Sequence, residues 1–465
     1  MSGPITPQGL EPIESVEADT VPEVARTVRA GLRVNIRGRS VRLRGLRHQP
    51  TGLLRWLLIL GPGLIATSAG NDAGGIATYS SAGAKYGYDL IWVMILLTIS
   101  YAVVQEMCSR LGAATGRGLL DLIRERYGLG WATFAVVIIL VANGGVTVSE
   151  FVGISAAVEL LGINKYIVVP LAAALIWYLV IFGSYSRVEK IFILMTLVFF
   201  AYPAAAFMAH PDWKQVAHGA FVPTIHADPD YIFILVGLLG TTLTPYIQIF
   251  QQSSLVEKGV ARRHYRHERV DAYFGALFSN LMSVFMIIAT AATLHAVGKT
   301  NIESAADAAR ALEPVVGNSA KLLFAVGLLG ASLLAGAVLP LATSYAISEA
   351  FGIPKGVNLD FRRGRVFFSL FTALIIIGMG LALIPNLPVI QLLVAVQVLN
   401  GILLPIILVF ILKLINDKRL MGDLKNTPLY NVLGWGTFVM ITTAVVLMLG
   451  SQLLKLLGIN LFGGS

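Results

Sequence analysis

Apolar runs follow one another along the chain from residue 54 almost to its end, separated by short polar links. Each is near the roughly 20 residues that a helix needs to cross a bilayer. We place eleven of them, at 54–86, 88–111, 131–160, 166–183, 190–208, 230–256, 271–297, 320–350, 366–384, 389–412 and 433–457. No stretch shows the repeated two-residue alternation of a membrane β-barrel, so helices are the spanning structure that fits. The pattern predicts an all-α integral membrane protein with about 11 transmembrane helices.

The composition agrees with this prediction. Of the residues, 56% are apolar and 13% charged, against roughly 25% charged in soluble domains. The single cysteine, Cys108, excludes an internal disulfide framework and a Cys-rich metal or iron–sulfur site. The apolar spans contain no metalloenzyme motif such as H-E-x-x-H, so we do not expect an enzyme or a resident cofactor.

The basic residues predict how the chain sits in the membrane. If the N-terminus is cytoplasmic, 28 of the 35 Lys and Arg lie in inside segments, and the excess holds loop by loop. Such a bias is typical of cytoplasmic loops. The net charge of +9 therefore reflects topology, and we expect no nucleic-acid partner. We expect a multi-pass protein of a cell membrane, a bacterial inner membrane by our interpretation, with the lipid bilayer as partner. Its oligomeric state stays open, and a monomer is compatible with the sequence.

The segment 1–50 precedes the first span and lacks the apolar core of a secretory signal. We expect residues 1–50 to be a cytoplasmic, disordered, Arg-rich tail, and residues 51–465 to form a single transmembrane domain. A mitochondrial transit peptide is the alternative, but such peptides are poor in acids. This segment contains five of them, Glu11, Glu14, Glu17, Asp19 and Glu23.

The first and sixth spans carry features that break a helix. Residues 70–75 of span one read GNDAGG and place Asp72 among glycines at membrane depth. An ionisable group there is costly and usually marks a functional site. Span six contains Thr244-Pro245, and the proline frees a backbone carbonyl one turn back. Either break alone is compatible with a packing or kink feature.

The two breaks correspond in position. Spans one and six each begin a unit of five spans, and the two units cross the membrane in opposite directions. Interrupted helices in matching places of two inverted halves point to a transporter's central site. The oxygen donors at these breaks suit Mg²⁺, Ca²⁺ or Mn²⁺ and are poor ligands for copper(I).

At these residues the chain resembles the Nramp family of divalent-metal transporters. The resemblance covers nearly all of residues 52–455. Three stretches carry it, GPGLIATSAGNDAGGIATYSSAGAKYGY, RLGAATGRGLLDLIRERYG and QVLNGILLPIILVFILKLINDKRLMG. It implies a LeuT-type inverted repeat of spans 1–5 and 6–10, with span 11 added and helices 1 and 6 broken.

This chain departs from the family pattern at several positions. The family reads Asp-Pro-Gly-Asn in span one, whereas here Gly75 stands in the place of the Asn ligand. The family's Met-Pro-His in span six is replaced by Thr244-Pro245-Tyr246, which removes the sulfur and the His. An Asp of span three is replaced by Thr147. The pattern is similar to the Nramp-related magnesium transporter branch, and we interpret the loss of the Asn side chain as an enlarged, all-oxygen site.

The resemblance implies a set of metal-binding positions. They are Asp72, Thr244, Thr241, Gln397, Gly75, Asn71 and Ala69. Asp72 would supply a carboxylate, Thr244 a hydroxyl, Thr241 a backbone carbonyl and Gln397 an amide, with Asn71 and the Ala69 carbonyl as supports. A helix–helix hydrogen bond is the alternative for Gln397.

We therefore expect a secondary transporter that brings Mg²⁺, and also Mn²⁺, into the cell by alternating access, without obligatory proton coupling. The first alternative is a proton-coupled Mn²⁺/Fe²⁺ symporter of the ordinary Nramp type. A sodium-coupled organic-solute symporter is a weaker alternative, because Asp72 would repel a substrate carboxylate. An ion channel also stays open, since a sequence does not report alternating access.

Four further polar residues are weighed against plainer interpretations. Glu106 is spaced four residues before Arg110 on one helix, which favours an ion pair over a metal ligand. Asn400 and Asn143 are interpreted as helix-packing residues. Glu150, deeper in span three, is kept as a weak candidate for an aqueous path.

Overall fold

The computed structural model describes residues 70–182 and 201–457, with gaps at 227, 258, 260–264, 311–312, 314–316, 318–319 and 358, and the strand residues 33–36 and 39–42. The chain divides into two units, residues 1–59 and 60–465, which are taken separately below. The expected spans 54–86 and 190–208 lie partly outside the described residues, so their first parts stay predictions.

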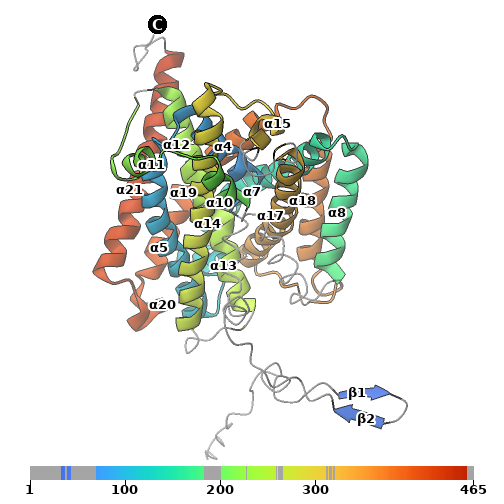
Figure 1. Ribbon diagram of the computed structural model, residues 1–465. Helices are drawn as coiled ribbons and strands as arrows, with labels where there is room; N and C mark the ends of the chain where they lie inside the picture. Colours follow the sequence, from blue (N-terminus) through green and yellow to red (C-terminus); the bar gives the residue numbers. More distant parts are fainter. Residues whose placement is uncertain are drawn as a thin grey trace, which may run out of the picture. The chain divides into compact units, whose positions relative to one another are not determined.

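The larger unit is all-helical in its described part (Figure 1). Its long helices are α4 (Ala73–Tyr86), α5 (Ile91–Thr115), α7 (Leu129–Leu160), α8 (Lys165–Phe182), α12 (Pro229–Thr242), α13 (Pro245–Glu257), α14 (Tyr265–Thr293), α17 (Ala320–Phe351), α18 (Arg365–Ala382), α19 (Val389–Ile415) and α21 (Pro428–Leu456). Shorter pieces are α6 (Leu119–Tyr127), α10 (Ala201–Met208), α11 (Trp213–Phe221), α15 (Ala305–Ala309), α20 (Lys418–Met421), η3 (His295–Val297) and η6 (Gly422–Leu424).

Within the described residues, nine helical segments are long and apolar enough to cross a membrane, with α12 and α13 taken together. They match the predicted spans to within a few residues at most ends, and span one is described from α4 onward. The largest differences are at the N-terminal ends of α14 and α21, which begin at Tyr265 and Pro428, earlier than predicted.

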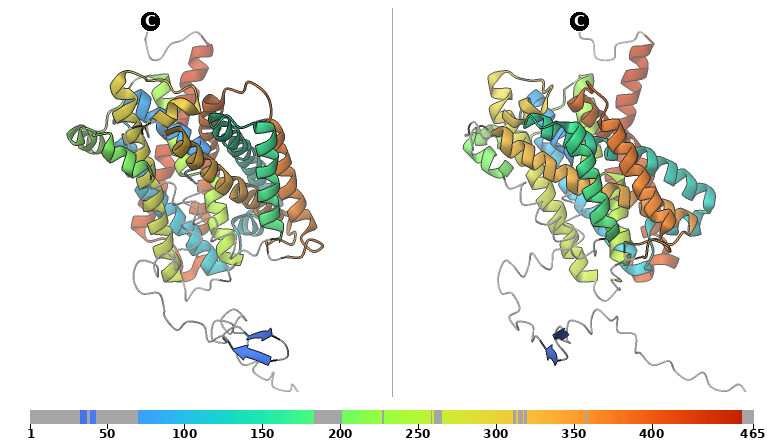
Figure 2. Two further views of the ribbon diagram at one scale, coloured as in Figure 1. Left: turned by 45° about the vertical axis from the view of Figure 1, so that its right-hand side comes forward. Right: turned by 90° about the vertical axis from the view of Figure 1, so that its right-hand side faces the viewer.

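The helices differ in how much of their surface is covered by protein. In the most apolar 18-residue stretch of each helix, 89% of the residues are buried for α12–α13, against 28% for α8 and 33% for α21. The exposed side chains of α8 and α21 are large and apolar, Leu171, Phe182 and Val446 among them. Such residues suit contact with lipid tails. The broken span six therefore lies inside the bundle, and α8 and α21 lie at its edge (Figure 2).

A close crossing of two helices supports the central position of α12. A Cβ on Gly240 of α12 would lie 1.9 Å from the backbone oxygen of Gln397 in α19. A Cβ on Gly401 would lie 2.5 Å from the backbone oxygen of Val236. Small residues at such crossings let membrane helices approach backbone to backbone. The contact fixes the end of α12 beside the middle of α19.

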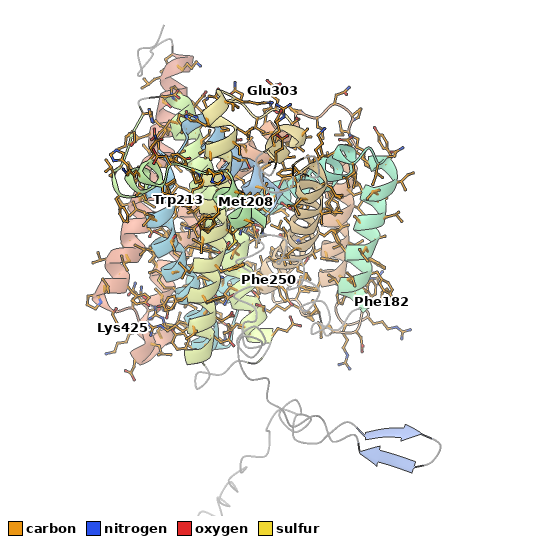
Figure 3. All side chains as sticks on the ribbon, in the orientation of Figure 1. Phe182, Met208, Trp213, Phe250, Glu303 and Lys425 are labelled. Carbon is orange, nitrogen blue, oxygen red and sulfur yellow. The ribbon has the colours of Figure 1, made fainter. Side chains whose placement is uncertain are left out.

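We name the two ends of the bundle after short helices. The end with α11 and α15 is the α15 end, and the opposite one is the α20 end (Figure 1). Figure 3 shows Glu303 at the α15 end, and Lys425 and Phe182 at the α20 end. Near the α20 end, the Arg110 guanidinium contacts Glu106 at 3.0 Å and both side chains are buried. The predicted ion pair is confirmed.

The smaller unit contains a two-stranded antiparallel sheet, β1 (Arg33–Ile36) and β2 (Arg39–Arg42), with Val34 opposite Val41. The expectation of a disordered tail covers residues 1–50, of which these eight are the ones described, so it stays a prediction. An isolated hairpin of this kind is marginally stable.

Candidate functional site

Asp72 stands at the start of α4, at the break predicted for span one. Gly70 and Asn71 are not helical, and Asp72 is the N-cap in an extended conformation. Its Oδ1 accepts a hydrogen bond from the Gly75 backbone N–H at 2.5 Å. A carboxylate at this position is stabilised by the free N–H groups and the dipole of the helix end. The buried charge is therefore held by the backbone of its own break.

Gln397 of α19 reaches the same carboxylate. Its Nε2 donates to Asp72 Oδ1 at 3.0 Å and to Oδ2 at 3.1 Å. Its Oε1 accepts from the Asn400 amide at 2.9 Å. Asn400, interpreted as a packing residue, thus holds the Gln397 amide. In this structure Gln397 acts on Asp72 as a donor, and a metal ligand role would need its oxygen to turn inward.

Span six is broken where the sequence predicts it. The helix α12 ends at Thr242 and α13 begins at Pro245. The Leu243 backbone oxygen, freed by the break, accepts from Gln248 Nε2 at 2.8 Å. The hydroxyls of Thr241 and Thr244 are fully buried and find no partner among the described residues. The break therefore presents two hydroxyl oxygens that are available to a ligand.

Gly75 brings one of those hydroxyls next to the carboxylate. A Cβ built on Gly75 would lie 2.9 Å from Thr241 Oγ1 and 3.2 Å from Asp72 Oδ1. The interpretation that Gly75 enlarges the site was therefore wrong for this conformation. The reason is that Thr241 closes in on the space that a side chain would fill. For Thr241 the structure points to the hydroxyl, whereas the resemblance implies the backbone carbonyl.

Glu150 of α7 brings a second carboxylate to the start of α4, although the sequence alone made it only a weak candidate. Its Oε2 accepts from the Ala73 backbone N–H at 3.2 Å, and Ser149 Oγ lies 3.4 Å from Oε1. The side chain is fully buried. An acid at mid-membrane depth in span three was the available signal. The helix α7 is unbroken here, and its Asn143 donates to Thr343 of α17 at 3.0 Å, which confirms the packing role of Asn143.

Asn71 faces α14. Its amide donates to the Ser279 backbone oxygen and hydroxyl, both at 3.2 Å, and its carbonyl accepts from Ser283 at 2.7 Å. These bonds tie the break in span one to α14, and the role of Asn71 as a support for the ion stays a prediction. Ala69 lies outside the described residues, so its carbonyl stays a prediction.

Tyr246 was singled out only as the replacement of a lost His, yet it borders the site. It is buried, and its side chain interacts with the Asp72 carboxyl. On the other side of the break, Tyr79 Oη lies 3.2 Å from Thr242 Oγ1. Around Asp72, the described side-chain groups that could coordinate a cation are therefore carboxyl, hydroxyl and amide groups.

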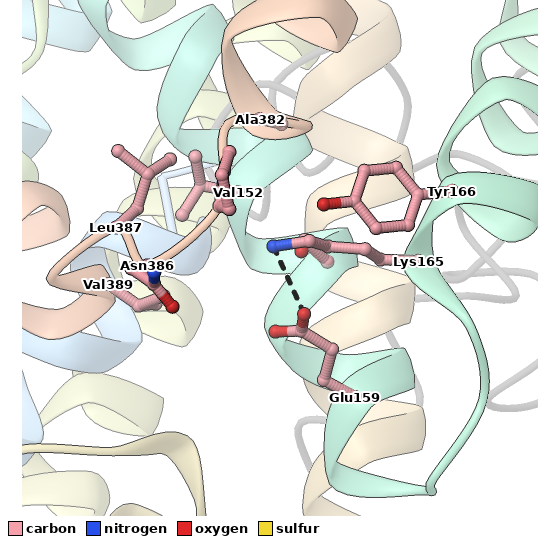
Figure 4. Close-up of a pocket in the computed structure, with 10 residues that line it drawn as sticks. Val152, Glu159, Lys165, Tyr166, Ala382, Asn386, Leu387 and Val389 are labelled. Carbon is pink, nitrogen blue, oxygen red and sulfur yellow. Dashed lines mark ion pairs between the residues drawn. The ribbon is translucent and has the colours of Figure 1, made fainter.

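No group of three or more His, Cys, Asp and Glu is gathered in the described part of the chain in a way that could hold a metal. A cation at Asp72 would depend on a mixed set of carboxylate, hydroxyl and amide oxygens. A separate cavity of about 330 Å³ lies where α7 ends and α8, α18 and α19 meet. Lys165 and Glu159 form an ion pair of 3.1 Å at its wall (Figure 4). Asp72 does not line it.

Residues 63–451 match the family model described as natural resistance-associated macrophage protein-like, Nramp. The chain belongs to the Nramp family. This Nramp protein is a multi-pass membrane protein and not an enzyme. It is 31% identical over 425 residues to the divalent metal cation transporter MntH of Deinococcus radiodurans, covering 88% of this chain and 92% of that one. It is 28% identical to a divalent metal cation transporter MntH of Klebsiella pneumoniae, covering 87% and 95%.

Solved structures agree on the fold. The manganese transporter of Eremococcus coleocola superposes with a TM-score of 0.70 at 18% identity, covering 88% of this chain and 90% of that one. A transporter of the nucleobase-cation-symport-1 family gives 0.54 at 15% identity, covering 84% and 91%, and MhsT in complex with L-phenylalanine gives 0.53 at 14%, covering 87% and 99%. The LeuT-type fold that the resemblance implies is confirmed. The two MntH proteins are named for divalent metal cations and the Eremococcus protein for manganese, and none of the three is named for magnesium.

Proposed function

We propose that this Nramp-family protein moves divalent metal ions across the membrane by alternating access, with Asp72 as the charged ligand. The observation that carries the proposal is the meeting of the two helix breaks. At that point Asp72 lies across Gly75 from a Thr241 hydroxyl that has no partner in the described part of the chain. Helix breaks that present backbone and side-chain oxygens at mid-membrane are typical of ion sites in this fold. The names of the relatives support a divalent metal as the cargo.

The donor chemistry supports Mn²⁺ and extends the proposal to Mg²⁺. Carboxylate, hydroxyl and amide oxygens suit Mg²⁺, Ca²⁺ and Mn²⁺, whereas a thioether or thiolate would select softer ions. The position of the family's Met is Thr244 here. Manganese is the ion that the Eremococcus relative is named for. The proposal that Mg²⁺ is also carried depends on the oxygen-containing side chains of this chain, because the space beside Gly75 is filled by Thr241.

Proton coupling defines a second candidate function, the ordinary proton-coupled Mn²⁺/Fe²⁺ symporter. The family His and Asp are replaced by Tyr246 and Thr147, which favours uptake without an obligatory proton. Against this, Glu150 keeps a second buried carboxyl beside Asp72, and such a group can carry a proton. The names of the relatives support the ordinary Nramp symporter better than an uncoupled magnesium carrier, and the uncoupled carrier stays our hypothesis only on the replacement of the His and the Asp.

The charges at the two ends of the bundle bear on its orientation in the membrane. The α20 end carries Arg110, Arg126, Lys418 and Lys425, with Asp417 paired to Arg126 at 2.6 Å. Cytoplasmic loops are enriched in such residues. We propose that the α20 end faces the cytoplasm and the α15 end the outside, so that uptake runs from α15 toward α20.

The test is ion flux into proteoliposomes that contain the purified chain. Rates for Mn²⁺, Mg²⁺, Ca²⁺ and Fe²⁺ are measured in parallel, with a pH-sensitive dye inside the vesicles. We expect saturable Mn²⁺ and Mg²⁺ entry without proton entry in a fixed ratio. Fe²⁺ and Mn²⁺ entry with no Mg²⁺ would refute the extension to magnesium, and proton entry in fixed ratio would establish the symporter. Inhibition of the flux by an amino acid would favour the organic-solute alternative.

A further inference from the structure

The helices α5 and α13 meet along a line of glutamines that the site at Asp72 does not use. Three of them, Gln248, Gln251 and Gln252, fall within five residues of α13, and Gln105 lies on α5 one turn before Ser109, which contacts Gln251. All four are fully buried. Polar side chains inside a membrane protein are costly, and they are usually kept for a function. We call this line the glutamine seam.

The contacts place the seam between the metal site and the α20 end. At its inner limit, the Tyr246 side chain interacts with the Asp72 carboxyl, and Tyr101 lies one helical turn before Gln105 on α5. One turn after Gln105 on α5, Ser109 Oγ accepts a hydrogen bond from Gln251 Nε2 at 2.9 Å. At the outer limit, Gln252 Nε2 donates to the backbone oxygen of Arg117 at 2.9 Å. The seam thus begins at Asp72 and ends where the helix α5 ends.

Several polar atoms in the seam have no partner among the described residues. These atoms are Tyr101 Oη, both side-chain polar atoms of Gln105, and the amide oxygens of Gln248, Gln251 and Gln252. A buried polar atom without a partner costs about 1–3 kcal/mol. Helix packing accounts for the hydrogen bonds that these side chains form, but not for the polar atoms that are left without a partner. The free atoms are mostly acceptors, which is the property that a cation needs.

The helix α13 is separated from α12 by the break in span six, at Leu243 and Thr244. It can therefore tilt as a half-helix. In this structure it is fastened to α17, since Ser253 Oγ donates to Glu349 Oε1 at 2.7 Å and Tyr345 is hydrogen-bonded to Glu257. Release of these bonds would open the seam toward the α20 end.

We propose that the glutamine seam is the exit half of the ion's route, where neutral amide oxygens of Gln105, Gln248 and Gln251 replace part of the water around a divalent cation leaving Asp72. The inference rests on the proposed transport function. Neutral oxygens fit this task because a route must bind an ion well enough to admit it and weakly enough to release it. A carboxylate in the seam would hold the ion, and an apolar side chain would exclude it.

The decisive variant is Gln105→Leu, because neither polar atom of Gln105 has a partner in the described residues. Removing an unpartnered buried amide should raise the melting temperature in detergent. We expect Mn²⁺ turnover in proteoliposomes to fall about tenfold, which corresponds to a barrier increase of about 1.4 kcal/mol. Mn²⁺ affinity, measured by calorimetry, should stay unchanged since Asp72 is untouched. Gln105→Asn keeps an amide oxygen and should restore part of the turnover.

The matched control is Gln452→Leu, the same change at an exposed position of α21. It should leave melting temperature and turnover unchanged. Wild-type turnover in Gln105→Leu would overturn the seam while leaving the proposed function intact. A lower melting temperature together with slower flux would assign Gln105 to packing and would also overturn it. A wild-type protein that binds and carries no divalent metal would refute the proposed function itself, and the seam with it.

Discussion

Asp72→Asn separates the charge of Asp72 from the part that its side chain plays in the fold. Asparagine caps a helix N-terminus about as well as aspartate, so the bond to the Gly75 N–H should persist. Its single carbonyl can still accept from Gln397. We therefore expect a melting temperature close to that of the wild type. The variant loses the negative charge at the meeting of the two breaks and one of the two oxygens that accept from Gln397.

The effect of the lost charge on metal binding can be bounded. Changing a residue that merely orients a metal ligand costs about 10–100-fold in affinity. Loss of the charged ligand itself should cost more than about 100-fold, or about 2.7 kcal/mol. Asp72→Ala should lose the same affinity and, in addition, the helix cap and the acceptor for Gln397. Those two losses add up to a destabilisation of about 2–5 kcal/mol.

The assay is Mn²⁺ calorimetry on the purified protein, with thermal unfolding measured on the same samples. Asp212→Asn is the matched control, because Asp212 caps α11 at the α15 end by accepting from the Lys214 N–H at 2.9 Å and lies away from Asp72. It should bind Mn²⁺ like the wild type. Affinity of Asp72→Asn within a few-fold of the wild type would refute the assignment of Asp72 as the charged ligand.

Three further predictions test the packing around the site and the ends of the bundle. Gly75→Ala should destabilise the protein by about 1–3 kcal/mol through overpacking against Thr241, and adding Thr241→Ala should restore the melting temperature; no effect of the single change would contradict the crowding. Glu106→Gln leaves a buried guanidinium without its counter-charge and should cost about 3 kcal/mol in unfolding free energy, which a melting temperature equal to the wild type would contradict. Burial opposes ionisation of Asp307 in the loop helix α15, but its bonds to Lys299 and to the capping serine lower its pKa. Its contribution is therefore present above the unfolded pKa of about 3.9 and lost as the pH falls below it, so proteolysis near α15 should increase between pH 5 and pH 2.5 in the wild type and not in Asp307→Asn.

The predictable part of the fold is the part that depends on neighbouring residues. Hydrophobic runs of spanning length gave the helices, and Gly, Asp and Pro gave the two breaks. The helix α4 begins at Ala73, directly after Asp72, and α13 begins at Pro245. A cap and a proline act within one turn of the chain, so their effect can be predicted before any tertiary contact is known.

The contacts across the site could not be predicted in this way. Gln397 and Asp72 are 325 residues apart, and the Glu150 bond joins α7 to the start of α4. Which face of each helix turns inward depends on the packing of all its neighbours. The sequence showed that burying the Glu150 carboxyl in its span costs free energy. It did not show that the backbone N–H of Ala73 donates a hydrogen bond to this carboxyl.

Gly75 shows why the absence of a side chain is a poor guide to the size of a site. The missing Asn suggested a wide cavity, but packed interiors contain few voids, and neighbours close over a small residue. Here Thr241 Oγ1 lies 2.9 Å from the position that a Cβ would take. The change from the family pattern therefore replaces one oxygen donor by another, and leaves the site tight. If the choice among metals differs from that of the relatives, its origin is the loss of sulfur at Thr244 and not a gain of volume at Gly75.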